Sequence, residues 1–504
     1  MGVMAHLVRA GAACACLLVL AGAAPALASD RIAILSSDGT IHRRTLHAGP
    51  VTELPEPPHR RAAQHGKARL AAHRTALSEL RRLHARGRID DAEYDARRRT
   101  YHQAKRAARK LSGTRQREMR AVIAIVNGIA ARGRLTPSRL APLWLTLDRN
   151  REWWTTAPWI PSSGERVSFS DDELVWQYYP GSGLQIQWLG TFGKLNALIK
   201  SRSQAKVDEA SAMVDQILPL ASWRAGGWAW EYEFPFDGGA PPWTSSLSQG
   251  TGLQALARSA QRLGRQADIL PIIERGITIF ETRTPRGVRV PTADGGAHYA
   301  QYSFARRLRI LNGFVQSLVG LFDYATITGD QTALTLFRAG EQEAEREVPE
   351  YDTGAWSLYS RGSSTHESDL SYHVLLRDFL SNLCDRTQVP VFCDTAQRFT
   401  DDLTTPPVVT VPAGQRPRAR RWSHLRLHLD KMSAVTVKVM RGDATVLSRY
   451  LGTIAYGDHS IGYTAPRRAG AYDVQVTARD LAGNAGGGTG TITVRPAKKK
   501  HEHG

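Results

Sequence analysis

The sequence predicts a multidomain α + β protein that is mainly α. Four helical hairpins are expected to form an α/α toroid between an N-terminal helical hairpin and a C-terminal β-sandwich. The chain has 504 residues, which is too long for one ordinary hydrophobic core. Apolar residues recur with helical periodicity from about 184 to 404. From 406 to 495 they alternate with polar residues, as in strands.

Helical segments in the middle of the chain come in pairs with short connections, and longer segments rich in Gly, Pro and Trp separate the pairs. Such consecutive hairpins are typical of an α/α toroid, in which the long loops build a cleft on one face. With a connecting loop region at 148–180, they define a domain from 148 to 405. The helices are expected near 184–203, 205–219, 245–264, 266–284, 309–329, 331–347, 369–384 and 391–404, and the long loops at 222–244, 285–308 and 348–368.

The C-terminal region, 406–495, predicts a separable β-sandwich. Alternating runs such as Val435–Val439 and Tyr472–Thr477 are separated by turn clusters at short, even spacing. The segment GAYDVQVTARDLAGN resembles the closing strands of bacterial Ig-like modules, which act as spacers or binding accessories. The basic residues 496–504 are expected to form a solvated tail.

The first residues, 1–28, predict a signal peptide. Arg9 precedes the apolar run Ala10–Ala24, and Ala26–Ala28 provides a cleavage site of the small-x-small type. The run is short for a membrane span. An uncleaved N-terminal anchor is the alternative. With either, the bulk of the chain is expected to be secreted or associated with the cell envelope.

A basic region, 29–147, follows the signal peptide. It opens with a Pro-rich extended lead-in. Leu77, Leu80 and Leu83 then mark an apolar stripe that ends at a turn, which predicts a helical hairpin, and the region continues as helix to 147. The hairpin either contacts an anionic polymer or the cell envelope through its charge, or is a solvated Arg-rich helix pair.

Two of the four cysteines, Cys14 and Cys16, lie in the signal peptide, so the mature chain keeps Cys384 and Cys393. An even pair in an oxidising compartment predicts one disulfide, and two buried free thiols are the alternative. Two cysteines make a poor metal site, and the nearby histidines are not at zinc-finger spacing. No metal is therefore expected.

The formal net charge of +19 indicates an anionic partner. Nucleic acid, an anionic lipid surface and an acidic polysaccharide all fit that sign. The signal peptide disfavours nucleic acid, which leaves an acidic polysaccharide or the cell-envelope surface. The sequence does not set the oligomeric state, and a dimer is compatible with it.

Five segments of the helical region stand out by their order and spacing. They are YYPGSGLQIQWLGTFGK from Tyr178, GGWAWEY from Gly226, PPWTSSLSQGTGL from Pro241, LNGFVQSLVGLFDY from Leu311, and YDTGAWSLYS from Tyr351 followed by SDLSYH from Ser368. Together they resemble the C-terminal catalytic domain of the D-glucuronyl C5-epimerase family over about 175–405. The resemblance implies an enzyme that inverts C5 of glucuronate within a polysaccharide, giving iduronate. The chemistry of this inversion needs no metal or organic cofactor, so none is expected.

Inversion at C5 begins with the removal of a weakly acidic hydrogen next to a carboxylate. It needs a base on one face of the sugar ring, an acid on the other and a neutralised carboxylate. The resemblance places two catalytic tyrosines at Tyr359 and Tyr372. Arg306, Arg309 and Arg361 are candidates for holding the substrate carboxylate. The alternative for each tyrosine is a core or rim aromatic with a satisfied hydroxyl.

Aromatic and polar side chains beside these segments complete the expected substrate-binding set. Sugar rings present an apolar face that suits the aromatic rings of Tyr179 and Trp243. For Trp243, burial in the core is the alternative. His373 directly follows the second tyrosine, and Gln301 lies in the segment HYAQYSFARR.

At Gln301 the sequence departs from the family. The resemblance implies a catalytic carboxylate at this position. Glutamine cannot take up a proton at neutral pH. Either another residue substitutes, with His298, Glu231 and Glu367 as candidates, or the chain has kept the cleft and lost the chemistry.

Three functions therefore fit the sequence. The first is a uronate C5-epimerase. The second is a non-catalytic secreted glycan-binding protein on the same fold. The third is a uronate polysaccharide lyase, which would begin with the same proton abstraction and then eliminate at C4. The polymer is not identified by the sequence.

We predict that the mature protein starts close to Ser29, because the expected cleavage site ends at Ala28. The intact mass of secreted material measures this directly. A mass that retains the first 28 residues would contradict the prediction.

Overall fold

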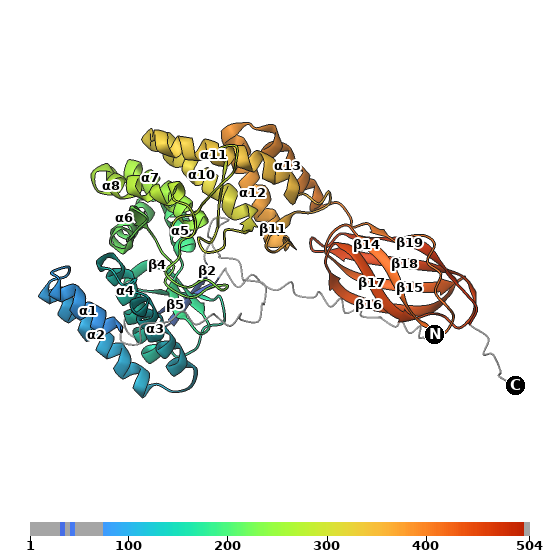
Figure 1. Ribbon diagram of the computed structural model, residues 1–504, viewed down its shortest axis with the longest axis horizontal. Helices are drawn as coiled ribbons and strands as arrows, with labels where there is room; N and C mark the ends of the chain where they lie inside the picture. Colours follow the sequence, from blue (N-terminus) through green and yellow to red (C-terminus); the bar gives the residue numbers. More distant parts are fainter. Residues whose placement is uncertain (1–30, 36–40, 46–73, 498–504) are drawn as a thin grey trace, which may run out of the picture.

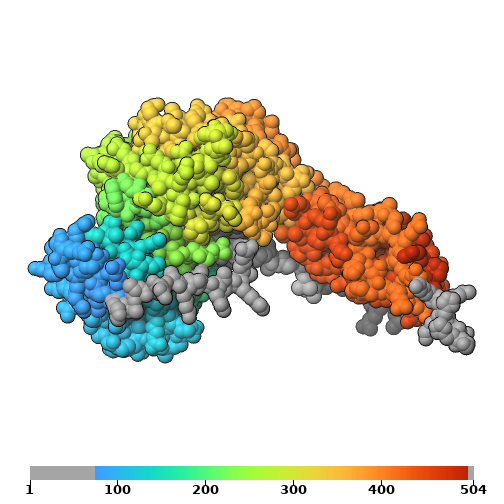
Figure 2. Space-filling model, in the orientation of Figure 1, coloured from blue at the N-terminus to red at the C-terminus, as the bar shows by residue number. Residues whose placement is uncertain are grey.

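The computed structural model describes residues 31–35, 41–45 and 74–497, and it shows an elongated molecule of two bodies (Figure 1). The helical body holds the described residues up to Asp402, and a β body follows it, as Figure 2 also shows. The predicted signal peptide with Cys14 and Cys16 lies outside the described residues. In the described part of the chain, no helix combines the length and the apolar character that a membrane crossing needs.

Four helices pack together at the end of the helical body that is far from the β body (Figure 1). Leu80 and Leu83 are buried on one face of the first helix, as the leucine stripe predicts. The side chains of Thr75 and Asp90 accept hydrogen bonds from backbone N–H groups and cap the first two helices. The four are α1 (Ala76–Ala85), α2 (Asp91–Lys110), α3 (Gly113–Ala131) and α4 (Pro137–Thr156).

A five-stranded sheet, in the order β2-β1-β3-β4-β5, packs against α3 and α4 and against the helices that follow it. The prediction of a connecting loop at 148–180 and of a helix from 184 is wrong in this region. Strand β4 is buried on both faces, so its side chains lack the alternation that reveals a strand in the sequence. The strands are β1 (Arg31–Leu35), β2 (Ile41–Thr45), β3 (Arg166–Phe169), β4 (Asp172–Tyr179) and β5 (Gly183–Ile186).

The helical pairs expected from the periodicity are all present. Their bounds lie within a few residues of the predicted ones, apart from the start of the first pair. A short helix, α9, follows α8. The pairs are α5 (Trp188–Ile199) with α6 (Gln204–Ile217), α7 (Ser246–Leu263) with α8 (Gln266–Gly276) and α9 (Thr278–Glu281), α10 (Leu311–Thr328) with α11 (Gln331–Glu347), and α12 (Leu370–Thr387) with α13 (Pro390–Asp402).

The first helix of each pair belongs to an inner row, in which α5 packs on α7, α7 on α10 and α10 on α12. Each second helix packs on its own partner. The backbones of α7 and α10 approach closely, because a Cβ atom on Gly320 would lie 2.3 Å from the carbonyl oxygen of Gly250. The long loops lead into the N-terminal ends of α7, α10 and α12 and so gather at one end of the row.

Short strands and 3-10 turns shape these loops. Strands β10, β11 and β12 form a small antiparallel sheet, in which Arg309 lies opposite Arg361. The elements are η1 (Leu218–Leu220), β6 (Ser222–Arg224), β7 (Gly227–Ala229), β8 (Arg289–Pro291), β9 (Ala297–Tyr299), β10 (Leu308–Ile310), η2 (Val348–Tyr351), β11 (Leu358–Gly362) and β12 (His366–Glu367).

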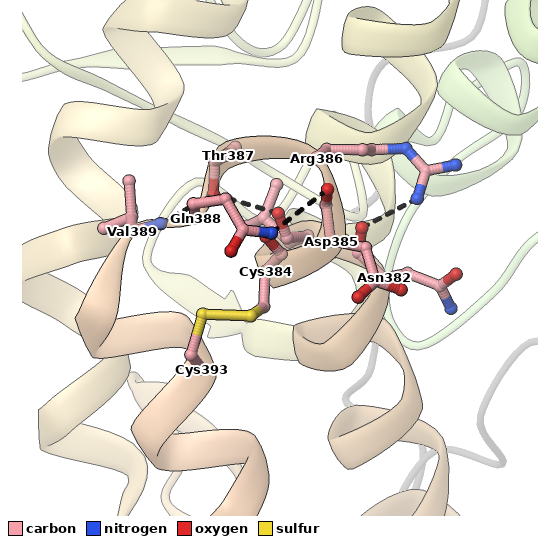
Figure 3. The surroundings of a disulfide bond; sticks show 9 residues. Asn382, Cys384, Asp385, Arg386, Thr387, Gln388, Val389 and Cys393 are labelled. Atoms are coloured by element: carbon pink, nitrogen blue, oxygen red, sulfur yellow. Dashed lines mark hydrogen bonds between the residues drawn. A yellow bond between two sulfur atoms is a disulfide. The ribbon is translucent and has the colours of Figure 1, made fainter.

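A disulfide joins Cys384 in α12 to Cys393 in α13 (Figure 3). It lies beside the tight turn between the two helices, where Gln388 adopts a left-handed conformation. The sequence separation is 9 residues. Closing a loop of this length restricts the unfolded chain and stabilises the fold by about 2–3 kcal/mol.

The β body consists of two antiparallel sheets, in the orders β13-β14-β17 and β16-β15-β18-β19. Alternate side chains of both sheets, such as Leu427 and Val437, are buried in one shared apolar core. The period-two pattern of the sequence arises from this burial. The strands are β13 (Val409–Thr410), β14 (Trp422–Leu429), β15 (Ser433–Arg441), β16 (Ala444–Ile454), β17 (Gly457–Thr464), β18 (Gly470–Asp480) and β19 (Ala485–Val494).

A buried carboxylate joins the two bodies. Glu367 on β12 accepts hydrogen bonds from the backbone N–H groups of Met432, at 2.8 Å, and Tyr456, at 2.7 Å. Both donors belong to the β body, whereas β12 pairs with β11 in the helical body. Glu367 therefore links the β body to the loop end of the inner row.

A buried ammonium group completes the junction. Lys431, only 1% exposed, donates hydrogen bonds to the carbonyl oxygens of Asp402 and Thr405, at 3.0 and 2.7 Å. Its Nζ atom also lies 5.4 Å from the centre of the Trp356 ring. These contacts fasten the chain segment that leads from α13 into the β body.

We predict that Glu367→Gln weakens this junction, because an amide cannot accept both hydrogen bonds as the carboxylate does. An unsatisfied buried group costs about 1–3 kcal/mol. Limited proteolysis should then cut near Pro406 faster than in the wild type, with a lower unfolding temperature. Glu345→Gln, at an exposed position of α11, is the matched control. Equal cleavage rates for the wild type and Glu367→Gln would contradict the prediction.

Candidate functional site

Tyr359 and Tyr372 come from neighbouring elements and lie against each other. Tyr359 belongs to β11, and Tyr372 lies in the first turn of α12. Asp369 caps this helix by accepting a hydrogen bond from the Tyr372 N–H at 2.8 Å. The two ring centres are 4.8 Å apart. Both residues remain partly exposed, so a ligand can reach them.

A third tyrosine, Tyr302, joins the pair to make the tyrosine cluster (Tyr302, Tyr359 and Tyr372). Its hydroxyl accepts a hydrogen bond from Nε2 of Gln301 at 3.1 Å, and it also interacts with Tyr359. A Cβ atom on Gly313 would lie 2.2 Å from Oε1 of Gln301, so the glycine of the NGF motif makes room for this side chain. Sequence reasoning missed Tyr302, although it directly follows Gln301.

Tyr302 and Tyr359 are neutral phenols at neutral pH. Burial raises the pKa of both Tyr302 and Tyr359 above the usual value of a phenol, and the neighbouring tyrosines raise the pKa of Tyr359 further. The carboxylate of Asp237, exposed in the loop before α7, adds to the rise in the pKa of Tyr302. Tyr302 and Tyr359 therefore hold their protons tightly, and Asp237 is a carboxylate that affects Tyr302.

His373 lies behind the cluster and is fully buried. Its ring stacks on Trp356, with centres 3.7 Å apart. Nε2 lies 2.8 Å from the Phe399 carbonyl oxygen and Nδ1 lies 3.2 Å from the Ser357 N–H, so a neutral ring can satisfy both partners. Burial lowers the pKa of His373 to about 4. The residue thus fixes β11 and α12 relative to each other and is sealed off from a substrate.

Trp243 and Tyr179 belong to an aromatic core that supports Tyr302. Trp243 is 1% exposed, and its ring stacks on Tyr232 with centres 4.4 Å apart. Its Nε1–H donates to the Phe234 carbonyl oxygen at 2.9 Å. The Tyr179 ring lies 4.4 Å from the Phe234 ring. Both side chains are thus engaged in packing, as in the alternative that the sequence left open for Trp243. The rings are Tyr179, Tyr232, Phe234, Phe236, Trp243, Tyr302 and Phe304.

Arg309 and Arg361 line a charged cavity of about 670 Å³ beside α11 and η2. Arg309 pairs with Glu343 at 3.2 Å and also with Glu347. Arg361 pairs with Glu350. Carboxylates of the same cavity therefore balance both arginines. A substrate carboxylate would have to displace them.

Arg306 differs from these two arginines. It is exposed, on the loop that follows Gln301 and Tyr302, and Arg307 beside it is exposed as well. These two guanidinium groups are the basic charges nearest in sequence to Tyr302. They are suited to meeting an anionic polymer that approaches the loop end of the inner row.

The three candidate substitutes for a carboxylate at Gln301 are engaged elsewhere. Burial lowers the pKa of His298 to about 3, and its Nδ1 lies 3.0 Å from a glutamate of α11. Glu231 is held by Arg139, at 2.6 and 3.1 Å, and by Arg224, at 2.7 Å. Glu367 binds the β body. Within the described ranges, no group of acidic, histidine or cysteine side chains is arranged to hold a metal ion.

We predict that His373→Gln reduces the pH dependence of stability. Because the pKa of His373 is about 4 in the folded state and about 6.5 in the unfolded state, the unfolded chain binds the proton more readily between these values. Its contribution is complete above pH 6.5 and decreases as the pH falls, by about 2 kcal/mol at pH 5.

Chemical denaturation at pH 7.5 and pH 5.0 measures this effect. The loss of unfolding free energy between the two conditions should be about 2 kcal/mol smaller in His373→Gln than in the wild type. His424→Gln, at an exposed position of β14, should behave like the wild type. Equal losses in wild type and His373→Gln would refute the role of the buried ring.

Two curated proteins are similar to parts of this chain. The chain is 24% identical over 176 residues to the D-glucuronyl C5-epimerase of Caenorhabditis elegans, covering 32% of this chain and 28% of the relative. It is 25% identical over 136 residues to the uncharacterized protein MJ1128 of Methanocaldococcus jannaschii, covering 26% of this chain and 44% of the relative. The chain thus spans less than half the length of each.

Among solved structures, the cellobiose 2-epimerase of Spirochaeta thermophila DSM 6192 aligns with a TM-score of 0.34 and 16% identity, covering 52% of this chain and 69% of that one. Residues 223–401 match the family described as D-glucuronyl C5-epimerase C-terminus. This range includes the tyrosine cluster but excludes the motif that begins at Tyr178. Over residues 223–401 the chain is therefore related to the D-glucuronyl C5-epimerases, which confirms the resemblance predicted from its motifs.

Proposed function

We propose that this protein is a C5-epimerase acting on uronic acid residues within an acidic polysaccharide. The observation that carries the proposal is the tyrosine cluster. Three phenols from separate segments meet at the loop end of the inner row, inside the region that matches the epimerase family. The activity is assigned to the domain at 148–405, and the signal peptide expected from the sequence would place it outside the cytoplasm.

The chemistry asks for a proton acceptor on one face of the sugar ring and a proton donor on the other. Removal of the C5 hydrogen leaves an electron pair that spreads into the carboxylate, and delivery of a proton to the opposite face completes the inversion. Tyr359 and Tyr372 are the residues proposed to exchange these protons. Two phenols whose ring centres are 4.8 Å apart can contact one sugar ring together.

Proton abstraction is the demanding half of this reaction. A phenol with a raised pKa is a weak acid. To act as a base it needs a nearby cation, or a carboxylate that takes up its proton. Gln301 cannot supply one, whereas Asp237 carries a charge close enough to affect Tyr302. Arg306 and Arg307 are proposed to meet the substrate carboxylate, because Arg309 and Arg361 are already paired.

A non-catalytic glycan-binding role is the second candidate. Gln301 favours it, because this buried amide occupies the position where the resemblance expects a carboxylate. The cleft would then keep its affinity for the polymer without exchanging protons.

Incubation of the mature protein with glucuronate-containing polymers in deuterated water separates these functions. Deuterium at C5, with formation of the C5 epimer, supports the epimerase. Ultraviolet absorbance of an unsaturated uronate supports a lyase instead. Polymer binding without either signal supports the glycan-binding role. In that case Gln301→Glu is the next variant to assay, because it restores a carboxylate of nearly the same shape. If the glutamine is the reason that the wild type does not exchange, this variant should exchange deuterium at C5.

We predict that Tyr359→Phe and Tyr372→Phe each slow C5 exchange by about 10²–10⁴-fold, because each removes a positioned acid or base. Polymer affinity should stay within about twofold of the wild type, since the ring is retained. Exchange is followed by mass spectrometry and affinity by calorimetry.

Tyr450→Phe is the matched control, because this tyrosine is 68% exposed on β16 of the β body. It should exchange at the wild-type rate. Asp237→Asn tests the carboxylate near Tyr302 and should slow exchange without weakening binding. If the wild type exchanges and both cluster variants match its rate, the site assignment is wrong.

A further inference from the structure

A second cavity lies among the inner helices, away from the tyrosine cluster. Its volume is about 230 Å³, and α5, α7, α10 and α12 all contribute to its walls. The wall residues run from the second turn of α7 and of α10 to the C-terminal ends of α5 and α12. On α12, for example, Arg386 follows Tyr372 by 14 residues, or about 21 Å of helix at 1.5 Å per residue. No wall residue belongs to the tyrosine cluster.

Positive charge dominates this cavity. Its lining includes Lys200, Arg258 and Arg386. The carboxylate of Asp323 forms ion pairs with the two arginines. Nη2 of Arg258 lies 2.5 Å from Asp323, and Nε and Nη2 of Arg386 lie 2.6 and 2.9 Å from it. Across the described part of the chain, Lys200 has no ion pair. Three cations therefore face one carboxylate, which leaves a local excess of two positive charges.

Neighbouring amides hold the guanidinium groups in place. Oδ1 of Asn196 accepts a hydrogen bond from Arg258 at 2.7 Å, and Asn196 in turn donates to Gln254 at 3.0 Å. Nε2 of Gln254 donates to Asp323 at 2.7 Å. This network fixes the arginines before any ligand arrives, which reduces the entropy that binding would cost.

The cations also disfavour one another. Burial and the charge of Arg258 lower the pKa of Lys200, and Arg386 contributes to the same effect. A bound anion would relieve this repulsion and would be desolvated together with the arginines, where charge-assisted hydrogen bonds are strong. Carboxylate, sulfate and phosphate groups have the negative oxygens that arginine and lysine bind.

We propose that this anion cavity, lined by Lys200, Arg258 and Arg386, binds a single oxyanion group. The ligand is an inorganic oxyanion or the acidic group of a saccharide, and both share the same chemistry of two or more negative oxygens. The three cations lie towards the opposite ends of the inner helices from the tyrosine cluster, so this is a second site that does not grip the sugar that reacts there. Its existence does not depend on the epimerase activity.

Calorimetric titration of the full-length protein with sodium sulfate, at constant ionic strength kept with sodium chloride, tests the proposal. Saturable binding of about one sulfate per chain is expected. Lys200→Gln should weaken it at least about fivefold, because one of three cations is lost while the Arg258–Asp323–Arg386 network remains. Lys206→Gln, an exposed lysine on α6, is the matched control and should bind like the wild type.

Glucuronate is the second arm of the experiment. If glucuronate competes with sulfate in the wild type, and competes more weakly in Lys200→Gln, the ligand is a saccharide acid. If sulfate binds and glucuronate does not compete, the ligand is an inorganic oxyanion. The proposal is overturned if sulfate produces no more heat than chloride, or if Lys200→Gln and Lys206→Gln bind sulfate equally well. Thermal denaturation of each variant without sulfate shows whether the fold is intact.

Discussion

The geometry of the candidate site depends on the buried stack of His373 on Trp356. The ring of His373 bonds to the chain on both sides, through Ser357 before β11 and Phe399 in α13, so it holds three elements at fixed distances. At the junction with the β body, the ammonium group of Lys431 lies over the Trp356 ring. The tyrosine pair and the attachment of the β body therefore rest on one aromatic stack, and the β body acts as a support for the loop end of the inner row.

The two ends of the inner helices have different chemistry. Tyrosine side chains gather where α10 and α12 begin, and cations gather towards the C-terminal halves of α5, α7 and α12. Arginines near the phenols fall into two groups, since Arg309 is neutralised by glutamates of α11 while Arg306 is exposed. The exposed Arg306 and Arg307 are therefore the arginines left to meet the anionic polymer proposed as substrate.

The sequence predicted the outer helices of the pairs and the strands of the β body well, because each buries one face and shows its period. The inner helices α7 and α10 were predicted too, although they are buried on nearly all sides. The sequence did not predict strand β4, because β4 is buried on both faces and its side chains lack a period-two alternation. The two expected tyrosines do meet, but Tyr302 was missed because its contact with Tyr359 joins residues far apart in the chain. The ion pair between Arg309 and Glu347 could not be predicted either, because 38 positions separate the two residues and only the fold brings them together.

The most direct test of the central claim is the structure of the protein with a bound glucuronate-containing oligosaccharide. We expect one uronate ring to lie against the tyrosine cluster, with its C5 facing the hydroxyls of Tyr359 and Tyr372 and its carboxylate towards Arg306. A saccharide bound only in the charged cavity beside α11, or in the anion cavity, with the phenols uncovered, would contradict this site assignment.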